Sequence, residues 1–153
     1  MSEAFFSETT VAADGVRLRC RAAGTGASVV CLHGGGGPRL SRAHALLAES
    51  HRVLALDLPG FGDAPPAPEN LAEFAALMNG AVTALGAEHY GLMAHGVGAG
   101  VALAMAIKRP EPVEAIVLLA PMAIRPRAPL DRIDRELLYA HPERQSDIAP
   151  LSA

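Results

Sequence analysis

The sequence predicts an α/β protein with a mostly parallel sheet, helices on both faces of that sheet and an antiparallel hairpin at the N-terminus. Short segments that are apolar throughout are typical of strands buried on both faces of a parallel sheet. Segments of helical length separate them, as repeated strand–helix–strand units require. The four apolar segments are residues 28–32, 52–58, 89–94 and 115–120.

The N-terminal hairpin is predicted from two loosely alternating segments. Residues 5–12 and 16–22 alternate between apolar and polar side chains on either side of Asp14-Gly15. Asp-Gly between two such segments is a strong signal for a tight hairpin turn. We therefore expect these segments to add antiparallel strands at an edge of the sheet.

Three segments between the apolar runs predict helices. Residues 40–50 form the first, before the run at 52–58 that Pro59-Gly60 ends. The second begins after Asn70, a residue type that caps helices well, and continues to about Gly86. The third, 97–109, ends before Pro110.

The chain is predicted to divide near residue 122. Residues 1–122 form the core, and residues 123–153 hold a proline-rich connector followed by a cap-like amphipathic segment. The connector is visible as PMAIRPRAP at 121–129. Beyond it, helical spacing of apolar residues predicts a stripe that requires a packing partner. The stripe consists of Leu130, Ile133, Leu137 and Leu138.

Composition excludes several classes of protein. Half of the residues are hydrophobic, 19% are charged and the net charge is −3, so neither a disordered chain nor a nucleic-acid-binding surface is indicated. No apolar run is long enough to span a membrane, and MSEAFFSETT does not resemble a signal peptide. We expect a cytoplasmic protein in which Cys20 and Cys31 are small buried hydrophobic residues.

Three motifs fall at the ends of predicted strands, where open α/β sheets carry their functional sites. They are CLHGGGGP at 31–38, LDLPGFGD at 56–63 and MAHGVGAG at 93–100. Together and in this order they resemble the α/β-hydrolase family, and KRPEPVEAIVLLAP at 108–121 resembles its next helix and strand. The resemblance covers about residues 10–125 and implies a truncated α/β-hydrolase topology.

The resemblance also implies a role for each motif. In the family, the first loop and the start of the helix after the third motif form the oxyanion hole, which places the backbone N–H groups of Gly35, Gly36 and Val97 there. His33 and Gly34 belong to the first motif as structural residues. Asp57 and Gly60 belong to a structural turn, in which Asp57 is expected to bind the backbone around Pro59-Gly60.

The third motif departs from the family pattern at its centre. The family's nucleophile elbow reads small-x-nucleophile-x-small, and here it reads Ala94-His95-Gly96-Val97-Gly98. Gly96 occupies the nucleophile position without a side chain, so covalent acyl transfer is impossible there. His95 is expected to be buried scaffold, and Gly98 to allow close packing of helix and sheet.

The resemblance places an acid after a later strand and a histidine near the C-terminus. After residues 115–120 the first carboxylate is Asp131, beyond the connector, and the one histidine that follows is His141 in the amphipathic segment. Neither position matches the family's acid or base. We therefore expect all three members of the catalytic triad to be absent, and the family's last strands to be missing.

No cofactor and no metal are predicted. Gly96, Gly98 and Gly100 suggest a dinucleotide-binding loop, but Val101 stands where the last glycine or alanine of that fingerprint belongs. Ala120 also stands where the acidic residue that binds the ribose would be expected. Three further histidines share no metal-ligand spacing and are expected to be uninvolved surface residues: His44, His51 and His89.

The leading hypothesis is a non-catalytic binding or interaction module for a small carbonyl, carboxylate or acyl ligand. The sequence of its elbow is also similar to that of the N-myc downstream-regulated family, whose members keep this fold and are considered non-enzymatic. The first alternative is a serine-hydrolase-type enzyme for esters or other acyl substrates, with its nucleophile replaced and its C-terminal half missing. The second is a cofactor-free lyase with His33 or His95 as base.

The predicted strand 115–120 raises a question of assembly. If no further strand follows it, an apolar edge of the sheet is left unpaired, which favours association. Three explanations remain open: a homodimer through this edge, the segment 130–140 folding back over it, and a chain that is a fragment. Neither a nucleic-acid nor a membrane partner is expected.

Overall fold

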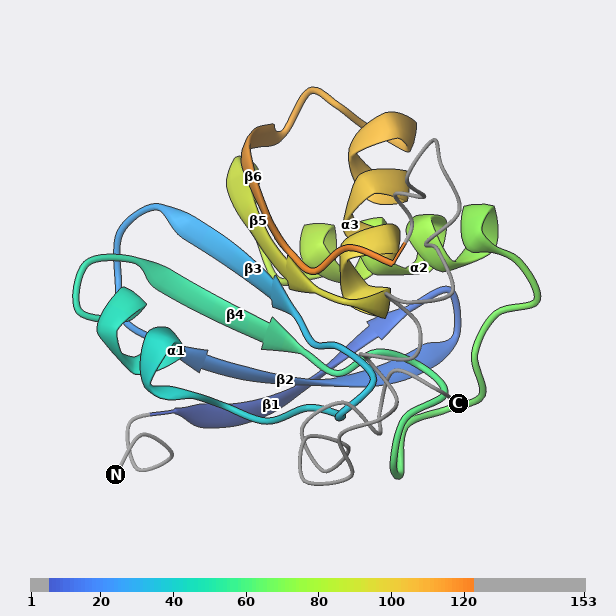
Figure 1. Ribbon diagram of the computed structural model, residues 1–153, viewed down its shortest axis with the longest axis horizontal. Helices are drawn as coiled ribbons and strands as arrows, with labels where there is room; N and C mark the ends of the chain where they lie inside the picture. The colour runs from blue at the N-terminus through green and yellow to red at the C-terminus, as the bar shows by residue number, and fades with distance from the viewer. Residues whose placement is uncertain (1–5, 123–153) are drawn as a thin grey trace, which may run out of the picture.

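The computed structural model describes residues 6–122, which form one sheet flanked by helices (Figure 1). The strands are β1 (Ser7–Ala13), β2 (Val16–Ala23), β3 (Ser28–Leu32), β4 (Arg52–Leu56), β5 (Tyr90–His95) and β6 (Val113–Leu119). The helices are α1 (Arg42–Leu47), α2 (Leu71–Ala84) and α3 (Val97–Lys108). The amphipathic segment, with Asp131 and His141, and the connector from residue 123 onward lie outside the described residues.

The strands lie in the order β1-β2-β4-β3-β5-β6. β3 is parallel to both β4 and β5, and β5 is parallel to β6. β2 is antiparallel to both β1 and β4. The predicted fold class is therefore confirmed: a mostly parallel sheet with an antiparallel hairpin at its N-terminus.

The hairpin turns at the residues that the sequence indicated. Ala13 pairs with Val16, and Asp14 and Gly15 between them have φ angles of 47° and 77°. A two-residue turn with two positive φ angles matches the right-handed twist of the strands that it joins. Aspartate tolerates this conformation better than most residues, and glycine adopts it freely.

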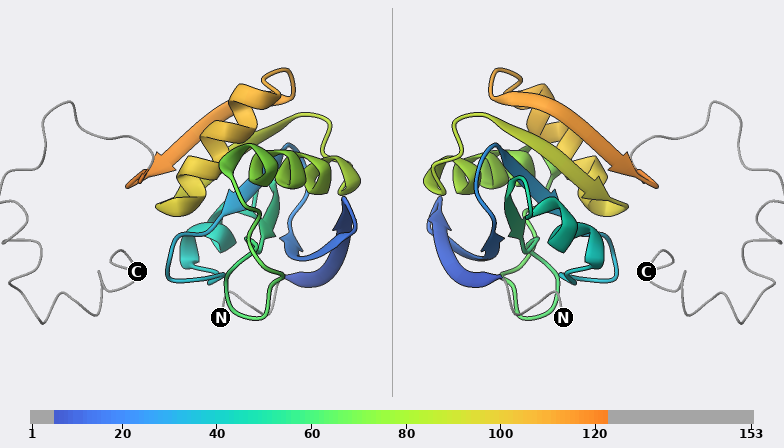
Figure 2. Two further views of the ribbon diagram at one scale, coloured as in Figure 1. Left: turned by 90° about the vertical axis from the view of Figure 1, so that its right-hand side faces the viewer. Right: turned by 90° about the vertical axis from the view of Figure 1, so that its left-hand side faces the viewer.

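Helices cover both faces of the sheet, as predicted (Figure 2). α2 and α3 pack together over one face, where they enclose the main core with alternate residues of the central strands. α1 lies over the other face, where Leu47 and Ala48 pack against a smaller buried cluster. That cluster consists of Cys31, Val53 and Ala55.

The helix predicted for residues 40–50 is shorter than expected. α1 ends at Leu47, and the chain then tightens, with Glu49 N–H donating to Leu46 O (3.2 Å) and Ser50 N–H to Leu47 O (3.2 Å). Bonds between residues three apart wind the last turn more tightly and bring the chain round to β4. α2 begins as predicted, since the Asn70 side chain accepts a bond from Glu73 N–H.

A buried polar network joins α2, α3 and β5. Asn79 of α2 is 7% exposed and donates from Nδ2 to Met105 O of α3 (3.2 Å). Its Oδ1 accepts from the hydroxyl of Tyr90 of β5 (3.3 Å), which is 2% exposed. Burial raises the pKa of Tyr90, so this hydroxyl keeps its proton.

β6 forms one edge of the sheet and pairs only with β5 among residues 6–122. It begins two residues before the predicted strand, at Val113. Its apolar side chains are largely in contact with solvent: Val117 is 54% and Leu119 50% exposed. The predicted homodimer through this edge stays a prediction. Across the described part of the chain, no helix has the length and apolar character that crossing a membrane requires.

Candidate functional site

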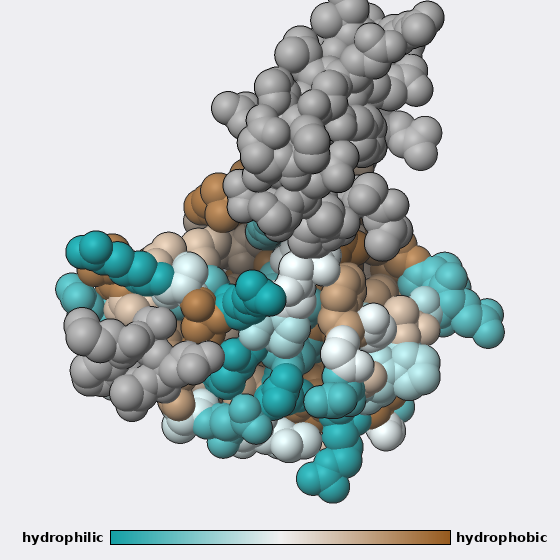
Figure 3. Space-filling view, turned by 60° about the horizontal axis from the view of Figure 1, so that its bottom comes forward, coloured by the Kyte–Doolittle hydropathy of each residue, from teal (hydrophilic) through white to brown (hydrophobic). Residues whose placement is uncertain are grey.

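The carboxyl ends of β3, β5 and β6 border a cavity of about 390 Å³. Its walls come from the glycine loop (residues 34–37), the start of α1 and the ends of these strands. Its titratable side chains are all basic: His33, Arg39, His44 and His95. On the face shown in Figure 3, hydrophilic side chains dominate the surface that is not drawn in grey, with smaller hydrophobic areas between them.

Gly96 forms the sharp turn between β5 and α3. Its φ and ψ angles are 54° and −117°, on the side of the Ramachandran map that residues with a side chain rarely occupy. The turn is tied to β6, because Gly96 N–H donates to Leu119 O (2.9 Å). Gly96 O accepts from the N–H groups of Ala99 and Met122, both at 3.2 Å. The structure thus places Gly96 at a strand-to-helix elbow beside the cavity.

Gly98 lies in the first turn of α3, directly against the end of β3. A Cβ atom at residue 98 would lie 2.9 Å from Leu32 O and closer still to His33 O. Contacts this short do not occur for real Cβ atoms, so a glycine here lets α3 approach the sheet. The geometry matches the close packing of helix and sheet that the sequence suggested.

The expected oxyanion donors lie around this elbow. Among the described residues, no acceptor is bonded to the N–H groups of Gly35 or Gly36, whereas Gly37 N–H bonds back to Gly34 O (3.1 Å). Val97 is the first residue of α3, so its N–H has no acceptor within the helix. Within residues 6–122, these three backbone N–H groups therefore have no bonded acceptor.

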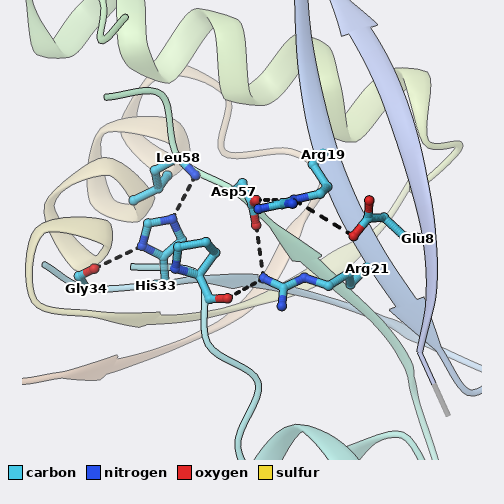
Figure 4. Close-up of polar contacts among 8 residues, drawn as sticks. Glu8, Arg19, Arg21, His33, Gly34, Asp57 and Leu58 are labelled. Atoms are coloured by element: carbon cyan, nitrogen blue, oxygen red, sulfur yellow. Dashed lines mark hydrogen bonds and ion pairs between the residues drawn. The ribbon is translucent and has the colours of Figure 1, made fainter. Parts of the chain in front are cut away.

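His33 is held through both ring nitrogens at the start of the glycine loop (Figure 4). Its Nε2 accepts from Leu58 N–H (2.9 Å), so a neutral ring carries its proton on Nδ1 and donates to Gly34 O (2.9 Å). The ring packs edge-on against Phe61. Burial lowers the pKa of His33, which favours this neutral form and leaves no free lone pair for a base.

The sequence suggested that Asp57 binds the turn that follows it, but the Asp57 side chain binds β2 instead. Its buried carboxylate accepts from Arg19 Nε at Oδ2 (2.6 Å) and from Arg21 Nη2 at Oδ1 (3.1 Å), both from β2. The expected role was wrong because the two guanidinium groups supply stronger, charge-assisted bonds than turn amides do. This carboxylate raises the pKa of Arg19 through a hydrogen bond and its charge.

Gly60 stabilises the turn after β4 through its own backbone. Its φ angle is 87°, and its N–H donates to Pro65 O (2.7 Å). A Cβ atom at residue 60 would lie 2.9 Å from the Cβ of Ala67. The turn therefore closes because residue 60 is a glycine, without help from Asp57.

His95 differs from its expected buried position. It ends β5 as an exposed side chain and lines the cavity, because no described residue covers this end of the strand. Its ring lies against Gly34, where an added Cβ would sit 3.1 Å from His95 Cε1. Gly34 thus leaves the space that the imidazole ring occupies.

His44 was expected on the surface but lines the same cavity. Its Nδ1 accepts from Ser41 N–H (3.1 Å) at the start of α1, and burial lowers its pKa. Sequence reasoning also missed Arg21, whose Nη2 donates to Pro38 O at the end of the glycine loop. The alternation of Arg17, Arg19 and Arg21 along β2 indicates a polar face, which is the one signal for this role.

Comparisons with known proteins agree with this arrangement. Residues 27–150 match the model of the alpha/beta hydrolase fold family. The chain is 35% identical, over 71% of its length and 30% of the relative's, to the dihydrolipoyllysine-residue acetyltransferase component of an acetoin cleaving system from Cupriavidus necator. It is 32% identical to epoxide hydrolase 2 from Siraitia grosvenorii, over 82% of this chain and 42% of the relative.

A solved structure has a similar fold. The crystal structure of a membrane phospholipase A superimposes with a TM-score of 0.77 and 26% identity, over 90% of this chain and 46% of that one. The chain spans less than half the length of each of these three proteins. The strand order, the glycine loop, the elbow at Gly96 and these matches lead to one conclusion: the chain belongs to the α/β-hydrolase fold family.

Proposed function

We propose that this chain is a pseudoenzyme of the α/β-hydrolase fold, a module that binds a small carbonyl, carboxylate or acyl ligand without covalent catalysis. The observation that carries the proposal is Gly96 at the elbow, with φ 54° and ψ −117° and no side chain to attack a carbonyl. Removing the nucleophile alone from a serine protease costs about 10⁶ in turnover, or roughly 8 kcal/mol of barrier.

The free backbone donors support ligand binding at the same place. Gly35 and Gly36 offer N–H groups that no described residue accepts, and Val97 offers one at a helix N-terminus. Such groups stabilise an oxygen that carries negative charge, and they need no nucleophile to do so. The guanidinium group of Arg39 on the cavity wall adds favourable charge for a carboxylate.

The alternative is a serine-hydrolase-type enzyme for esters or other acyl substrates, with residue 96 replaced. Relatives named epoxide hydrolase and 2-hydroxymuconate semialdehyde hydrolase favour hydrolytic chemistry. Space also favours this alternative, since a Cβ at residue 96 would meet only Gly34 Cα, at 3.6 Å. A lyase that uses His33 as base is less well supported, because both of its ring nitrogens are already bonded.

Three forms of the full chain test the proposal: the unchanged protein, Gly96→Ser and the control Gly96→Ala. We expect the unchanged chain and Gly96→Ala to release no p-nitrophenol from p-nitrophenyl acetate above the buffer rate. Sodium butyrate should shift the amide resonances of Gly35, Gly36 and Val97 in the unchanged chain. Hydrolysis by the unchanged chain would refute the proposal, and hydrolysis by Gly96→Ser alone would support a scaffold that lacks only its nucleophile.

A further inference from the structure

The glycine loop is anchored at both of its ends to two consecutive residues after β4 (Figure 4). At its start, His33 Nε2 accepts from the N–H of Leu58 (2.9 Å). At its end, Pro38 O accepts from Arg21 Nη2, and the same nitrogen donates to Asp57 Oδ1 (3.1 Å). Arg21 is therefore the bridge between the end of the loop and Asp57.

A bridge at this point has a clear physical purpose. Four consecutive glycines lose more backbone entropy on ordering than any other residues of the same number would. Gly37, with φ 83°, adopts a conformation that favours glycine. Holding only the His33 end would leave the other end of the loop to explore many conformations. The bond from Arg21 to Pro38 O restricts that end, together with the bonds from Gly37 N–H to Gly34 O (3.1 Å) and from Arg39 N–H to Gly37 O (2.9 Å).

Arg19 provides an internal comparison, because it shares one of the two functions of Arg21. Both guanidinium groups pair with Asp57, but Arg19 has no bond to the loop. The Arg19 side chain is also more exposed, at 43% against 15% for Arg21. The bond to Pro38 O is therefore the contact with the glycine loop that Arg21 has and Arg19 lacks.

We propose that Arg21 is a positioning residue for the glycine loop, which holds the amides of Gly35 and Gly36 in the geometry that binds a ligand oxygen. This inference rests on the proposed function for its ligand. Arg21 itself does not line the cavity, so it acts through Pro38 and the loop.

The test compares Arg21→Met and Arg21→Lys with the control Arg19→Met in the full chain. Two quantities are measured for each variant: the amide resonances and hydrogen exchange of residues 35–37 without ligand, and the affinity for sodium butyrate. We expect Arg21→Met to shift these resonances, to speed their exchange and to weaken butyrate binding at least tenfold, about 1.4 kcal/mol. Arg19→Met should change the affinity less than twofold.

Arg21→Lys distinguishes positioning from a merely structural role. Both bonds of Arg21 come from a single nitrogen, so an ammonium group that reaches either acceptor should restore part of the loop order and of the affinity. If Arg21→Met fails to fold, the Arg21→Lys variant provides the test. We expect its butyrate affinity to be lower than that of the unchanged chain, by less than tenfold. Loop resonances and affinity that are unchanged in the Lys variant would then overturn the inference.

Two other results would overturn the inference directly. A folded Arg21→Met variant with unchanged loop resonances would show that the bridge does not order the loop. An equal loss of butyrate affinity in Arg19→Met would show that the affinity depends on the pairing of Asp57 with arginine and not on the bond to Pro38 O. If the unchanged chain does not bind butyrate, the proposed function fails with this ligand, while resonances and exchange of residues 35–37 still decide the role of Arg21.

Discussion

Two glycines of one motif, separated by Val97, serve different physical purposes. Gly96 is needed for its backbone conformation, since its φ angle is positive and a Cβ there would meet nothing closer than 3.6 Å. Gly98 is needed for its lack of volume, since it adopts helical geometry but lies against the carbonyl groups of Leu32 and His33. A substitution therefore has a different cost at each position: backbone strain at residue 96 and a steric clash at residue 98.

Gly98→Ala should destabilise the protein although alanine favours helices. The added methyl group would force α3 away from β3, and overpacking of this kind costs about 1–3 kcal/mol. Gly80→Ala in α2 is the matched control, because the added Cβ would lie at an ordinary contact distance of 3.4 Å from the Cβ of Ala13. This variant should be stabilised by the higher helix propensity of alanine, which contributes about 1 kcal/mol. Urea unfolding measures both, and equal stabilities for the two variants would contradict the packing argument.

His33 should make stability depend on pH. Burial lowers its pKa below the usual 6.5, so the unfolded chain binds more protons than the folded one just below that pH. Stability is therefore fully present above pH 6.5 and should fall as the pH falls below it. His44, whose pKa burial also lowers, contributes with the same sign.

The variant His33→Asn tests this assignment. It lacks the titrating ring, so its free energy of unfolding should fall less steeply between pH 6.5 and 5.5 than that of the unchanged chain, whatever its absolute stability. Urea titrations at a series of pH values measure the two slopes. Equal slopes would assign the pH dependence to other groups.

At the scale of elements, the polar network of Asn79 fixes α2 against α3 and β5. Asn79→Ala would leave the Tyr90 hydroxyl buried without a partner and would open a cavity, while Met105 O would keep only its bond from Arg109 N–H (2.9 Å). An unsatisfied buried group costs about 1–3 kcal/mol and the cavity adds to that cost, so we expect a loss of about 2–4 kcal/mol in urea unfolding.

Tyr90→Phe is the milder change in the same network. It removes the hydrogen bond from the Tyr90 hydroxyl to Asn79 Oδ1 (3.3 Å) but leaves the bond from Asn79 Nδ2 to Met105 O in place. We expect a loss of less than about 1.5 kcal/mol, since a typical hydrogen bond contributes about that much or less. A greater loss in Tyr90→Phe than in Asn79→Ala would place the centre of the network on the tyrosine.

The elements of this fold were largely predictable because local patterns encode them. The apolar segment at 28–32 coincides with β3, and Asp14-Gly15 identified the hairpin turn. The pairing of Asp57 with two arginines was not predictable, because it depends on which residues of β2 lie beside β4. That register joins Cys20 to Leu56, 36 residues apart in sequence, and no local pattern specifies it.

The candidate site was likewise predictable where a local sequence motif encodes it and not where it depends on tertiary contacts. The family resemblance identified the glycine loop and Gly96, because their sequence motifs are contiguous. Arg21 and the exposure of His95 depend on tertiary contacts or their absence, so neither follows from a motif. The polar alternation of β2 was the one local indication of a role for Arg21, and it did not identify the residue that Arg21 contacts.

At the scale of the whole molecule, we expect self-association through β6. Its apolar side chains are exposed, and its backbone is paired on one side only within residues 6–122. Val117→Lys should weaken association, since a charge on an edge strand opposes pairing. Ile107→Lys is the control, because that residue is 82% exposed on α3 and not on the edge.

Sedimentation velocity over a range of concentrations measures this association. We expect the unchanged chain and Ile107→Lys to sediment faster as the concentration rises, and Val117→Lys to do so less. An unchanged chain that stays monomeric throughout that range would rule out association through this edge.

The order of the strands in the sheet also determines how the polypeptide reaches its native state. Only the first two strands form a local pair; β2 must wait for β4, and β3 must wait for both β4 and β5. In a newly made chain, one side of β3 therefore stays unpaired until residue 95 has been synthesised. Distant pairs of this kind form slowly, and until they form the unpaired edge of an apolar strand can associate with other chains.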